Sequence, residues 1–261
     1  MAKSAVWSNV TGGKSKANFY KSHDNKYILK CVNKHEFKMF IETGFQYFHH
    51  NAKFLFHKMP SALAKILGAY KIKIKHTKTN KVENNFIILM ENLFYGKDSV
   101  DRINNIKAYD LKGSKSNRYI AKKDQTPNQV LPDTNFKEDF NGEPITLERN
   151  MAELLKAAVH NDSLVLSKMN VVDYSLLLII DMNPHLSGTK DKYSPHDNSN
   201  QNCIKSIRVG IIDYVRKYTW DKQLEHVGKI IINRLQVPTI VNPVNYRERF
   251  KEAIDNFFIG L

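Results

Sequence analysis

The chain has 261 residues, a formal net charge of +14 at pH 7, and 42% hydrophobic residues. This length suits one large domain or two modest lobes with a real core. The longest apolar run, Leu176–Ile180, is too short to span a bilayer, and the N-terminus lacks the apolar core of a signal peptide. Only two cysteines, Cys31 and Cys203, predict a reducing compartment without a disulfide framework. The excess of positive charge predicts an anionic partner: nucleic acid, an acidic membrane surface or a phosphorylated substrate.

The first structured segment is predicted to be a hairpin. Thr11–Asn18 is a small, polar, glycine-containing turn, and Phe19–Tyr20 and Tyr27–Cys31 have the composition of two strands. The spacing of a P-loop is absent. The glycine-containing turn either is an ordinary turn or lays its N–H groups over phosphates.

Lys30 lies in the second strand among apolar residues, so its side chain either reaches solvent or faces a charged ligand. The spacing of apolar residues predicts a helix over His35–Phe48. Its predicted apolar stripe comprises Phe37, Phe40, Ile41, Phe45 and Phe48. Glu36, in the first turn, can turn back and pair with Lys30. A strand lysine held by a helix glutamate orients the ATP phosphates in protein kinases, whereas the alternative is a simple surface ion pair.

The next segment, Pro60–Leu67, is predicted to be a short helix. The alternating sequence YKIKIK, Tyr70–Lys75, predicts a strand with Lys71, Lys73 and Lys75 on one face. These lysines either protect an edge strand from aggregation or form a cationic face that docks on anionic lipid, and the two roles are compatible. The apolar run Asn85–Met90 predicts a buried strand that ends at a hinge, Glu91–Leu93.

The stretch YDLKGSKSNRY, Tyr109–Tyr119, places three cations, Lys112, Lys115 and Arg118, around Gly113. Glycine permits a tight or left-handed turn, and flanking lysine and arginine can hold a phosphate. The stretch is therefore either a phosphate-handling loop or a solvated basic turn.

The polar, proline-containing sequence of Ala121–Glu143 predicts mostly loop. A helix is predicted over Thr146–His160 with Thr146 as its N-cap, and a second helix over Asp162–Lys168. The predicted apolar stripe of the first helix comprises Leu147, Met151, Leu154, Leu155 and Ala158.

Two acids flank buried strands. Asp173 precedes the predicted strand Tyr174–Ile180, and Asp213 follows the predicted strand Ile207–Ile212. Because burying an unpaired carboxylate is costly, such an acid has a partner or a function, and Asp213 at a strand end suits Mg²⁺. The polar segment between the strands, residues 182–202, is predicted to be a flexible insertion.

The C-terminal part is predicted to contain two helices. One would begin at Trp220 with Thr219 as its cap, and the final helix at Asn242-Pro243 with asparagine as its N-cap. The apolar stripe of the final helix comprises Tyr246, Phe250, Ile254, Phe257 and Phe258, which core packing explains.

These features follow the order found in bilobal ATP-dependent kinases, although the HRD and DFG motifs of protein kinases are absent. The chain resembles the phosphatidylinositol phosphate kinases. YDLKGSKSNRY resembles their DLKGS motif followed by NR, NVVDYSLL their MDYSLL motif, and VGIIDY their IID motif. Four segments resemble the PIKfyve-type, or type III, branch: Ala64–Tyr70, Met90–Gly96, Val209–Glu225 and Pro238–Ala253. Val172 and Ile179 depart from the motif, where methionine and glycine are usual.

The resemblance implies an α+β, bilobal kinase-like fold of the SAICAR synthase-like type, with antiparallel sheets packed against helices. It implies a single catalytic domain over residues 1–261, with an N-lobe at about 1–92 and a C-lobe at about 93–261. The chain would be the catalytic core only, and it would use ATP and Mg²⁺.

The resemblance also implies the residues on the nucleotide side of the site. Lys30 would hold the ATP phosphates with Glu36 as its partner, and Asp213 would hold Mg²⁺. The other implied ATP contacts are Gly12, Gly13, Lys14 and Ser15 over the phosphates, and Met90, Asn92 and Leu93 at the hinge.

On the lipid side, Asp173 would orient or deprotonate the attacking inositol hydroxyl. Lys112 would stabilise the transferring phosphoryl group, and Arg118 would help to hold the lipid phosphate. Residues 227–241 would form a short specificity loop at the membrane, with Lys229 and Arg234 beside headgroups. Ile230–Ile232 either insert into the membrane or continue the apolar stripe of the Trp220 helix.

The resulting hypothesis is a lipid kinase that makes phosphatidylinositol 3,5-bisphosphate from phosphatidylinositol 3-phosphate, peripherally on endosomal or vacuolar membranes. A phosphatidylinositol 4-phosphate 5-kinase is the nearest alternative, because the shortened specificity loop leaves substrate choice open. A non-catalytic phosphoinositide-binding module is an alternative of another class. A nucleic-acid partner is not expected, because the basic strand lacks interleaved aromatic residues.

Overall fold

The computed structural model describes residues 5–6, 18–96, 105–114, 119–126, 129–182, 204–216, 218 and 242–261. Several predictions lie outside these residues: the phosphate loop Gly12–Ser15, Lys115, Arg118, residues 183–202 of the insertion, the helix from Trp220, and Lys229, Ile230–Ile232 and Arg234 of the specificity loop.

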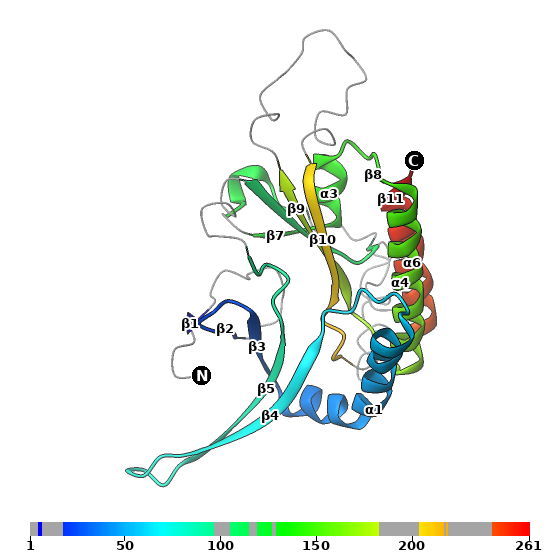
Figure 1. The fold of residues 1–261 in the computed structure, drawn as a ribbon. Coiled ribbons are helices and arrows are strands. Elements are labelled where there is room, and N and C mark those ends of the chain that lie inside the picture. The colour runs from blue at the N-terminus through cyan, green and yellow to red at the C-terminus, as the bar shows by residue number, and fades with distance from the viewer. Residues whose placement is uncertain are drawn as a thin grey trace, which may run out of the picture.

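A five-stranded antiparallel sheet contains the strands that precede Asn92. Its order is β1 (Ala5–Val6), β2 (Phe19–Lys21), β3 (Tyr27–Val32), β5 (Val82–Glu91) and β4 (Ile66–Lys75). The predicted β2–β3 hairpin and the predicted strands in YKIKIK and Asn85–Met90 are thereby confirmed. The far part of the β4–β5 hairpin projects away from the rest of the chain (Figure 1).

The segment before β4 is not the short helix predicted over Pro60–Leu67. Ile211 N donates to Ala62 O at 2.6 Å, and Ala64 N donates to Ile211 O at 2.9 Å. The segment therefore runs extended beside another strand, which satisfies backbone groups that a helix would have satisfied internally.

Helix α1 spans Lys34–His57 and is longer than the predicted helix, because no glycine or proline stops it after Phe48. Its buried residues are Met39, Phe40, Thr43, Gly44, Tyr47 and His50. The predicted stripe is wrong at three positions, since Ile41 and Phe48 are exposed and Phe45 is 82% exposed. Two apolar stripes share this helix, and the spacing of residues does not reveal which one faces the sheet.

A four-stranded sheet has the order β10 (Ile204–Ile212), β9 (Ser175–Met182), β6 (Ile106–Leu111) and β7 (Val130–Pro132). The pairs β10–β9 and β9–β6 are antiparallel, and β6–β7 is parallel. The two predicted strands beside Asp173 and Asp213 are thereby confirmed, each with slightly different ends. Strand β9 lies in the middle of the sheet, which explains its continuous apolar sequence.

Helix α4 (Arg149–Lys168) replaces the two helices predicted over Thr146–His160 and Asp162–Lys168. Thr146 is not its N-cap, because β8 (Ile145–Leu147) pairs in parallel with β11 (Phe258–Gly260) and delays the helix. The predicted stripe is also wrong at Met151 and Leu154, which are exposed. The buried residues are Ala152, Ala158, Val159, Asp162, Ser163 and Leu166.

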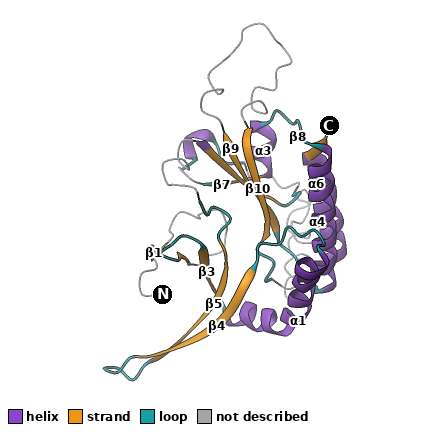
Figure 2. Cartoon of the chain, in the orientation of Figure 1, coloured by secondary structure: helices purple, strands orange, loops and turns teal. Residues whose placement is uncertain are grey.

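The loop predicted over Ala121–Glu143 contains a 3₁₀ helix (Lys122–Asp124), β7 and α3 (Asp133–Asp139). Each of these elements is short, and the polar composition of the whole stretch predicts loop more strongly than the few residues of each element predict a helix or a strand. The final helix, α6 (Pro243–Phe257), is confirmed with Asn242 as its N-cap and its predicted apolar stripe buried. Helices α4 and α6 contact each other and lie side by side (Figures 1 and 2).

One hydrophobic core cluster joins the parts of the molecule. It contains Tyr47 of α1, Ile88 of β5, Leu176 of β9 and Phe250 of α6. The predicted α+β class, with largely antiparallel sheets and packed helices, is confirmed. The division into lobes at about residue 92 stays a prediction. No helix among the described residues is long and apolar enough to cross a membrane.

Candidate active site

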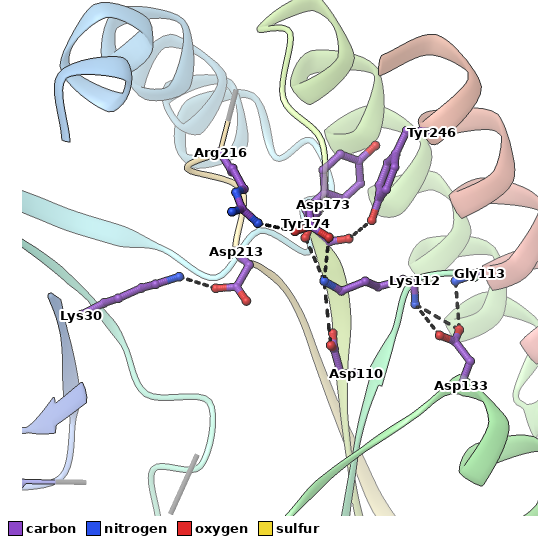
Figure 3. Close-up of polar contacts among 10 residues, drawn as sticks. All are labelled: Lys30, Asp110, Lys112, Gly113, Asp133, Asp173, Tyr174, Asp213, Arg216 and Tyr246. Carbon is purple, nitrogen blue, oxygen red and sulfur yellow. Dashed lines mark hydrogen bonds and ion pairs between the residues drawn. The ribbon is translucent and has the colours of Figure 1, made fainter. Parts of the chain in front are cut away.

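Charged residues from distant parts of the sequence meet at one place (Figure 3). They lie in β3, after β6, before β9 and after β10. Lys30 Nζ lies 2.5 Å from Asp213 Oδ1, although 183 residues separate the two in sequence. Lys112 Nζ lies 3.1 Å from Asp173 Oδ1 and 4.0 Å from Asp110 Oδ2. The structure therefore brings together four predicted site residues: Lys30, Lys112, Asp173 and Asp213.

Lys30 pairs with Asp213. The sequence predicts Glu36 as its partner, and this prediction is wrong. The Glu36 carboxylate instead accepts a hydrogen bond from Asn33 N at 3.3 Å, and Asn33 Oδ1 accepts one from Glu36 N at 2.8 Å. This capping box satisfies N–H groups at the start of α1 that have no partner within the helix. The Lys30 side chain is 12% exposed and reaches the end of β10.

Asp213 follows β10 with a positive φ of 62°, a conformation that is uncommon for a residue other than glycine. Burial acts to raise the pKa of its carboxyl, but the nearby charges of Lys30 and Lys112 outweigh burial and hold the pKa below its ordinary value. The carboxylate is therefore ionised at neutral pH. Its side chain is 46% exposed, so one face of the carboxylate remains accessible.

Asp173 also has a positive φ, of 68°, at the entrance to β9. Its carboxylate lies between two cations, because Arg216 Nη1 donates to Oδ2 at 2.9 Å while Lys112 Nζ donates to Oδ1 at 3.1 Å. Burial acts to raise the pKa of Asp173, but Lys112 and Arg216 together lower it below its ordinary value. Both acids therefore have a left-handed backbone, and the charge of Lys112 lowers the pKa of both. Strained backbone of this kind clusters at functional sites.

Lys112 is largely buried, and its Nζ donates to both the carboxylate and the backbone oxygen of Asp173 at 3.1 Å. Burial acts to lower the pKa of Lys112, but the charges of Asp110, Asp173 and Asp213 outweigh it and raise the pKa. Lys112 is therefore a fixed positive charge at neutral pH, held beside the carboxyl groups of Asp110 and Asp173.

The turn that carries Lys112 is shaped by Gly113 and Asp133. Gly113 has a φ of 65°, and a Cβ at this position would lie 2.6 Å from Ala253 Cβ and 2.8 Å from Arg249 O. The buried Asp133 carboxylate accepts from Lys112 N at 3.0 Å and from Gly113 N at 2.9 Å. The loop is thus anchored to the start of α3 and closely covered by α6.

Sequence reasoning missed Arg216 and Asp133 as residues of this site. Arg216 lies 43 positions from Asp173 in the chain, and no local pattern links the two. Asp133 lay in a stretch that was predicted to be loop. A weak signal existed for Asp133, since an acid directly after proline is common at a helix start.

The predicted hinge residues have their own contacts in the protein. Asn92 Nδ2 donates to Asn25 O at 2.7 Å, and Asn92 Oδ1 accepts from Phe94 N at 3.0 Å, so the side chain shapes the turn after β5. Leu93 O accepts from Arg208 Nη1 at 2.7 Å, which ties β10 to the hinge. Contacts of Met90, Asn92 and Leu93 with ATP stay predictions.

The predicted membrane face lies on the projecting β4–β5 hairpin. Lys71, Lys73 and Lys75 are exposed, and they share one face because they pair in register with alternate residues of β5. The predicted alternation is confirmed, whereas contact with lipid stays a prediction.

Comparison with known proteins shows the family of the chain. A family model described as phosphatidylinositol-4-phosphate 5-kinase matches residues 1–206 and 184–257. The chain is 34% identical over 267 residues to the 1-phosphatidylinositol 3-phosphate 5-kinase FAB1 of Saccharomyces cerevisiae, covering 99% of this chain and 10% of that protein. It is 36% identical over 264 residues to the human 1-phosphatidylinositol 3-phosphate 5-kinase, covering 99% of this chain and 11% of that protein.

A plant protein has the same relationship to this chain. The 1-phosphatidylinositol-3-phosphate 5-kinase FAB1B of Arabidopsis thaliana is 34% identical over 252 residues, which cover 95% of this chain and 13% of that protein. The chain therefore spans little more than a tenth of the length of these relatives. The resemblance stated from the motifs is confirmed, and the chain belongs to the phosphatidylinositol-4-phosphate 5-kinase family.

Proposed function

We propose that this chain is a lipid kinase that transfers the γ-phosphoryl group of ATP to the 5-hydroxyl of phosphatidylinositol 3-phosphate. The use of ATP follows from membership of a kinase family. The observation that carries the proposal is the meeting of two ion pairs, Lys30–Asp213 and Lys112–Asp173, at one place. The names of the yeast, human and plant relatives favour the 3-phosphate over the 4-phosphate as substrate.

The proposed chemistry needs positioning and charge more than covalent participation by the protein. Asp173, ionised at neutral pH, accepts a hydrogen bond from the attacking inositol hydroxyl and takes its proton as the bond to phosphorus forms. The bond between the γ-phosphorus and the bridging oxygen breaks, and ADP leaves. Lys112 lies 3.1 Å from Asp173 and neutralises charge that develops on the transferring phosphoryl oxygens. Lys30 contacts the phosphates of ATP from the opposite side of the site.

Asp213 fits a Mg²⁺ ion that arrives with the nucleotide. Its carboxylate is a hard oxygen donor, ionised and partly accessible. Within the described ranges no group of three or more His, Cys, Asp or Glu residues could hold a metal alone. Mg²⁺ is ordinarily held by one or two carboxylates together with substrate phosphates and water, so this donor set is sufficient. The ion would supply charge neutralisation on the phosphates.

The lipid side of the proposal rests on cations. The exposed Lys71, Lys73 and Lys75 face the headgroups of an anionic membrane. Electrostatic attraction to these headgroups contributes on the order of 1 kcal/mol of binding free energy per lysine near the surface. Arg118, Lys229 and Arg234 belong to the proposed lipid-phosphate site by resemblance. A peripheral position on endosomal or vacuolar-type membranes is part of the same proposal.

The test is a panel of vesicles, each containing one phosphatidylinositol monophosphate, incubated with labelled ATP and Mg²⁺. We expect product from the 3-phosphate, with the label on the 5-position, and no product with the Asp173→Asn variant. Product from the 4-phosphate alone would favour the alternative 5-kinase. Lipid binding without turnover, unchanged by Asp173→Asn, would instead support a non-catalytic phosphoinositide-binding module.

A further inference from the structure

Asp162 lies outside the site described above, yet it is a fully buried acid with an unusual number of partners. It belongs to α4, and its side chain is 0% exposed. Its Oδ2 accepts from Ala62 N at 2.6 Å, from Leu63 N at 3.1 Å and from Ser61 Oγ at 3.2 Å. Its Oδ1 lies 2.6 Å from His50 Nε2 of α1. Burying a carboxylate is costly unless such partners satisfy it, so these bonds hold the segment 61–63 firmly.

The segment held by Asp162 in turn holds the end of β10. Ala62 O accepts from Ile211 N at 2.6 Å, and Ala64 N donates to Ile211 O at 2.9 Å. Leu63 and Ile211 form an isolated parallel bridge. On the other side of Asp213, the Tyr214 hydroxyl donates to Ala64 O. Ile211 and Tyr214 lie on either side of Asp213 in the sequence, and both are hydrogen-bonded to residues 62–64.

These hydrogen bonds matter because Asp213 has a left-handed backbone, with a φ of 62°. A non-glycine residue in this conformation costs of order 1–3 kcal/mol, and the conformation persists only where neighbouring contacts determine it. Residues 61–64 lie outside the helices and the named strands, so their own hydrogen bonds within one element do not fix them. Hydrogen bonds to the Asp162 carboxylate hold these residues in place instead.

We propose that Asp162 is a positioning residue for Asp213. It acts through residues 61–64, fixing the backbone that carries the carboxylate. The inference rests on the proposed role of Asp213 toward Mg²⁺. It assigns to a fully buried residue of α4 a specific effect on metal affinity, in addition to any effect on folding. Residues that orient a metal ligand from outside its direct contacts typically change metal affinity about 10–100-fold when they are altered.

The test uses Asp162→Asn, which preserves side-chain size but leaves one oxygen acceptor where there were two. The matched control is Asp255→Asn. Asp255 of α6 contacts His160 of α4 at 3.1 Å. The control therefore removes another His–Asp pair that involves α4 and, among the residues that the structure describes, is not hydrogen-bonded to residues 61–64. Tyr214→Phe is a second variant, which removes the hydroxyl bonds to Ala64 O and to Tyr47 Oη and keeps the proposal testable if Asp162→Asn does not fold.

Two measurements follow for each variant. Mn²⁺ binding, followed by electron paramagnetic resonance with a non-hydrolysable ATP analogue, should weaken about tenfold for Asp162→Asn and Tyr214→Phe and remain at the wild-type value for Asp255→Asn. Amide hydrogen exchange of the ligand-free proteins should become faster over residues 211–214 in the same two variants. Kinase activity should recover at higher Mg²⁺ concentration, because Asp213 itself is intact.

The outcomes separate this inference from the proposed function. Wild-type Mn²⁺ affinity in both folded variants would overturn the positioning role and leave Asp162 as a structural residue. If Asp213→Asn does not weaken Mn²⁺ binding, the proposed metal role of Asp213 fails. In that case, faster hydrogen exchange over residues 211–214 in Asp162→Asn would by itself still show that Asp162 holds this backbone. Unchanged exchange in this variant would overturn the positioning role too.

Discussion

Arg216 Nη1 lies 2.9 Å from Asp173 Oδ2, and Lys112 Nζ lies 3.1 Å from the other oxygen of the same carboxylate. The proposed catalytic base is thus held from both sides. Each cation lowers the pKa of Asp173 against the opposing effect of burial. The Arg216 side chain is about half exposed, whereas that of Lys112 is largely buried, so the two cations are separable by mutation.

Replacing Arg216 with glutamine should change the pH dependence of catalysis. Asp173 is ionised above its lowered pKa, and activity is lost as the pH falls through that pKa. Removing the Arg216 charge raises the pKa, so the acidic limb of the kcat/KM profile should move to higher pH. Arg208→Gln is the control, because its guanidinium bonds to Leu93 O and Tyr95 O instead. If the acidic limb is the same in wild type and Arg216→Gln, the acidic limb does not report a pKa of Asp173 that Arg216 lowers.

Replacing Lys112 with methionine should reduce kcat with little effect on KM for the lipid. The ammonium group is proposed to act on charge that develops in the transition state, and the loss of one such donor costs about 10²–10³-fold in kcat. Lys107→Met is the matched control, since Lys107 lies in β6, the strand that precedes Lys112, and pairs with Asp139 of α3 at 3.1 Å. Steady-state kinetics with both variants decides the point, and an equal loss in the control would argue for a general effect of charge.

Gly113→Ala should destabilise the fold and reduce activity together. The new Cβ would lie 2.6 Å from Ala253 Cβ and 2.8 Å from Arg249 O, and the backbone has a positive φ. The strain of the backbone alone costs of order 1–3 kcal/mol. Gly142→Ala is the control, because Gly142 also has a positive φ, of 80°, but a Cβ at this position would meet no atom within 4 Å. Urea unfolding of both variants should show the larger loss for Gly113→Ala; equal losses would exclude close packing as the cause.

Charge reversal on the hairpin, Lys71/Lys73/Lys75→Glu, should weaken binding to anionic vesicles by at least about 100-fold, because the loss of three lysines at about 1 kcal/mol each already accounts for that factor. Binding of the wild type should also weaken as ionic strength rises. The control is Lys122/Lys123/Lys168→Glu, which makes the same change of charge at other exposed positions. Vesicle sedimentation measures both, and equal weakening would show that net charge, rather than this face, controls binding.

Much of the local structure was predictable because its signals are local. The alternation of YKIKIK predicted a strand, the Asn242-Pro243 cap predicted the start of α6, and the apolar run after Asp173 predicted β9. Errors arose where a longer-range contact decided the outcome. Thr146 lies in a strand because β11 pairs with it, and Phe45 is exposed because another stripe of α1 faces the sheet.

The sequence was enough to name Lys30, Lys112, Asp173 and Asp213 as candidates. Lys112, Asp173 and Asp213 stand in recognisable motifs, and Lys30 is a charged residue in an apolar strand. The partners of these residues depend on how the chain folds. Lys30 meets Asp213 across 183 residues rather than Glu36 six positions away, because the helix start uses the Glu36 carboxylate for its own N–H groups. Motifs specify the chemistry that a residue can perform, whereas partners are set by the packing of distant segments, which no local pattern encodes.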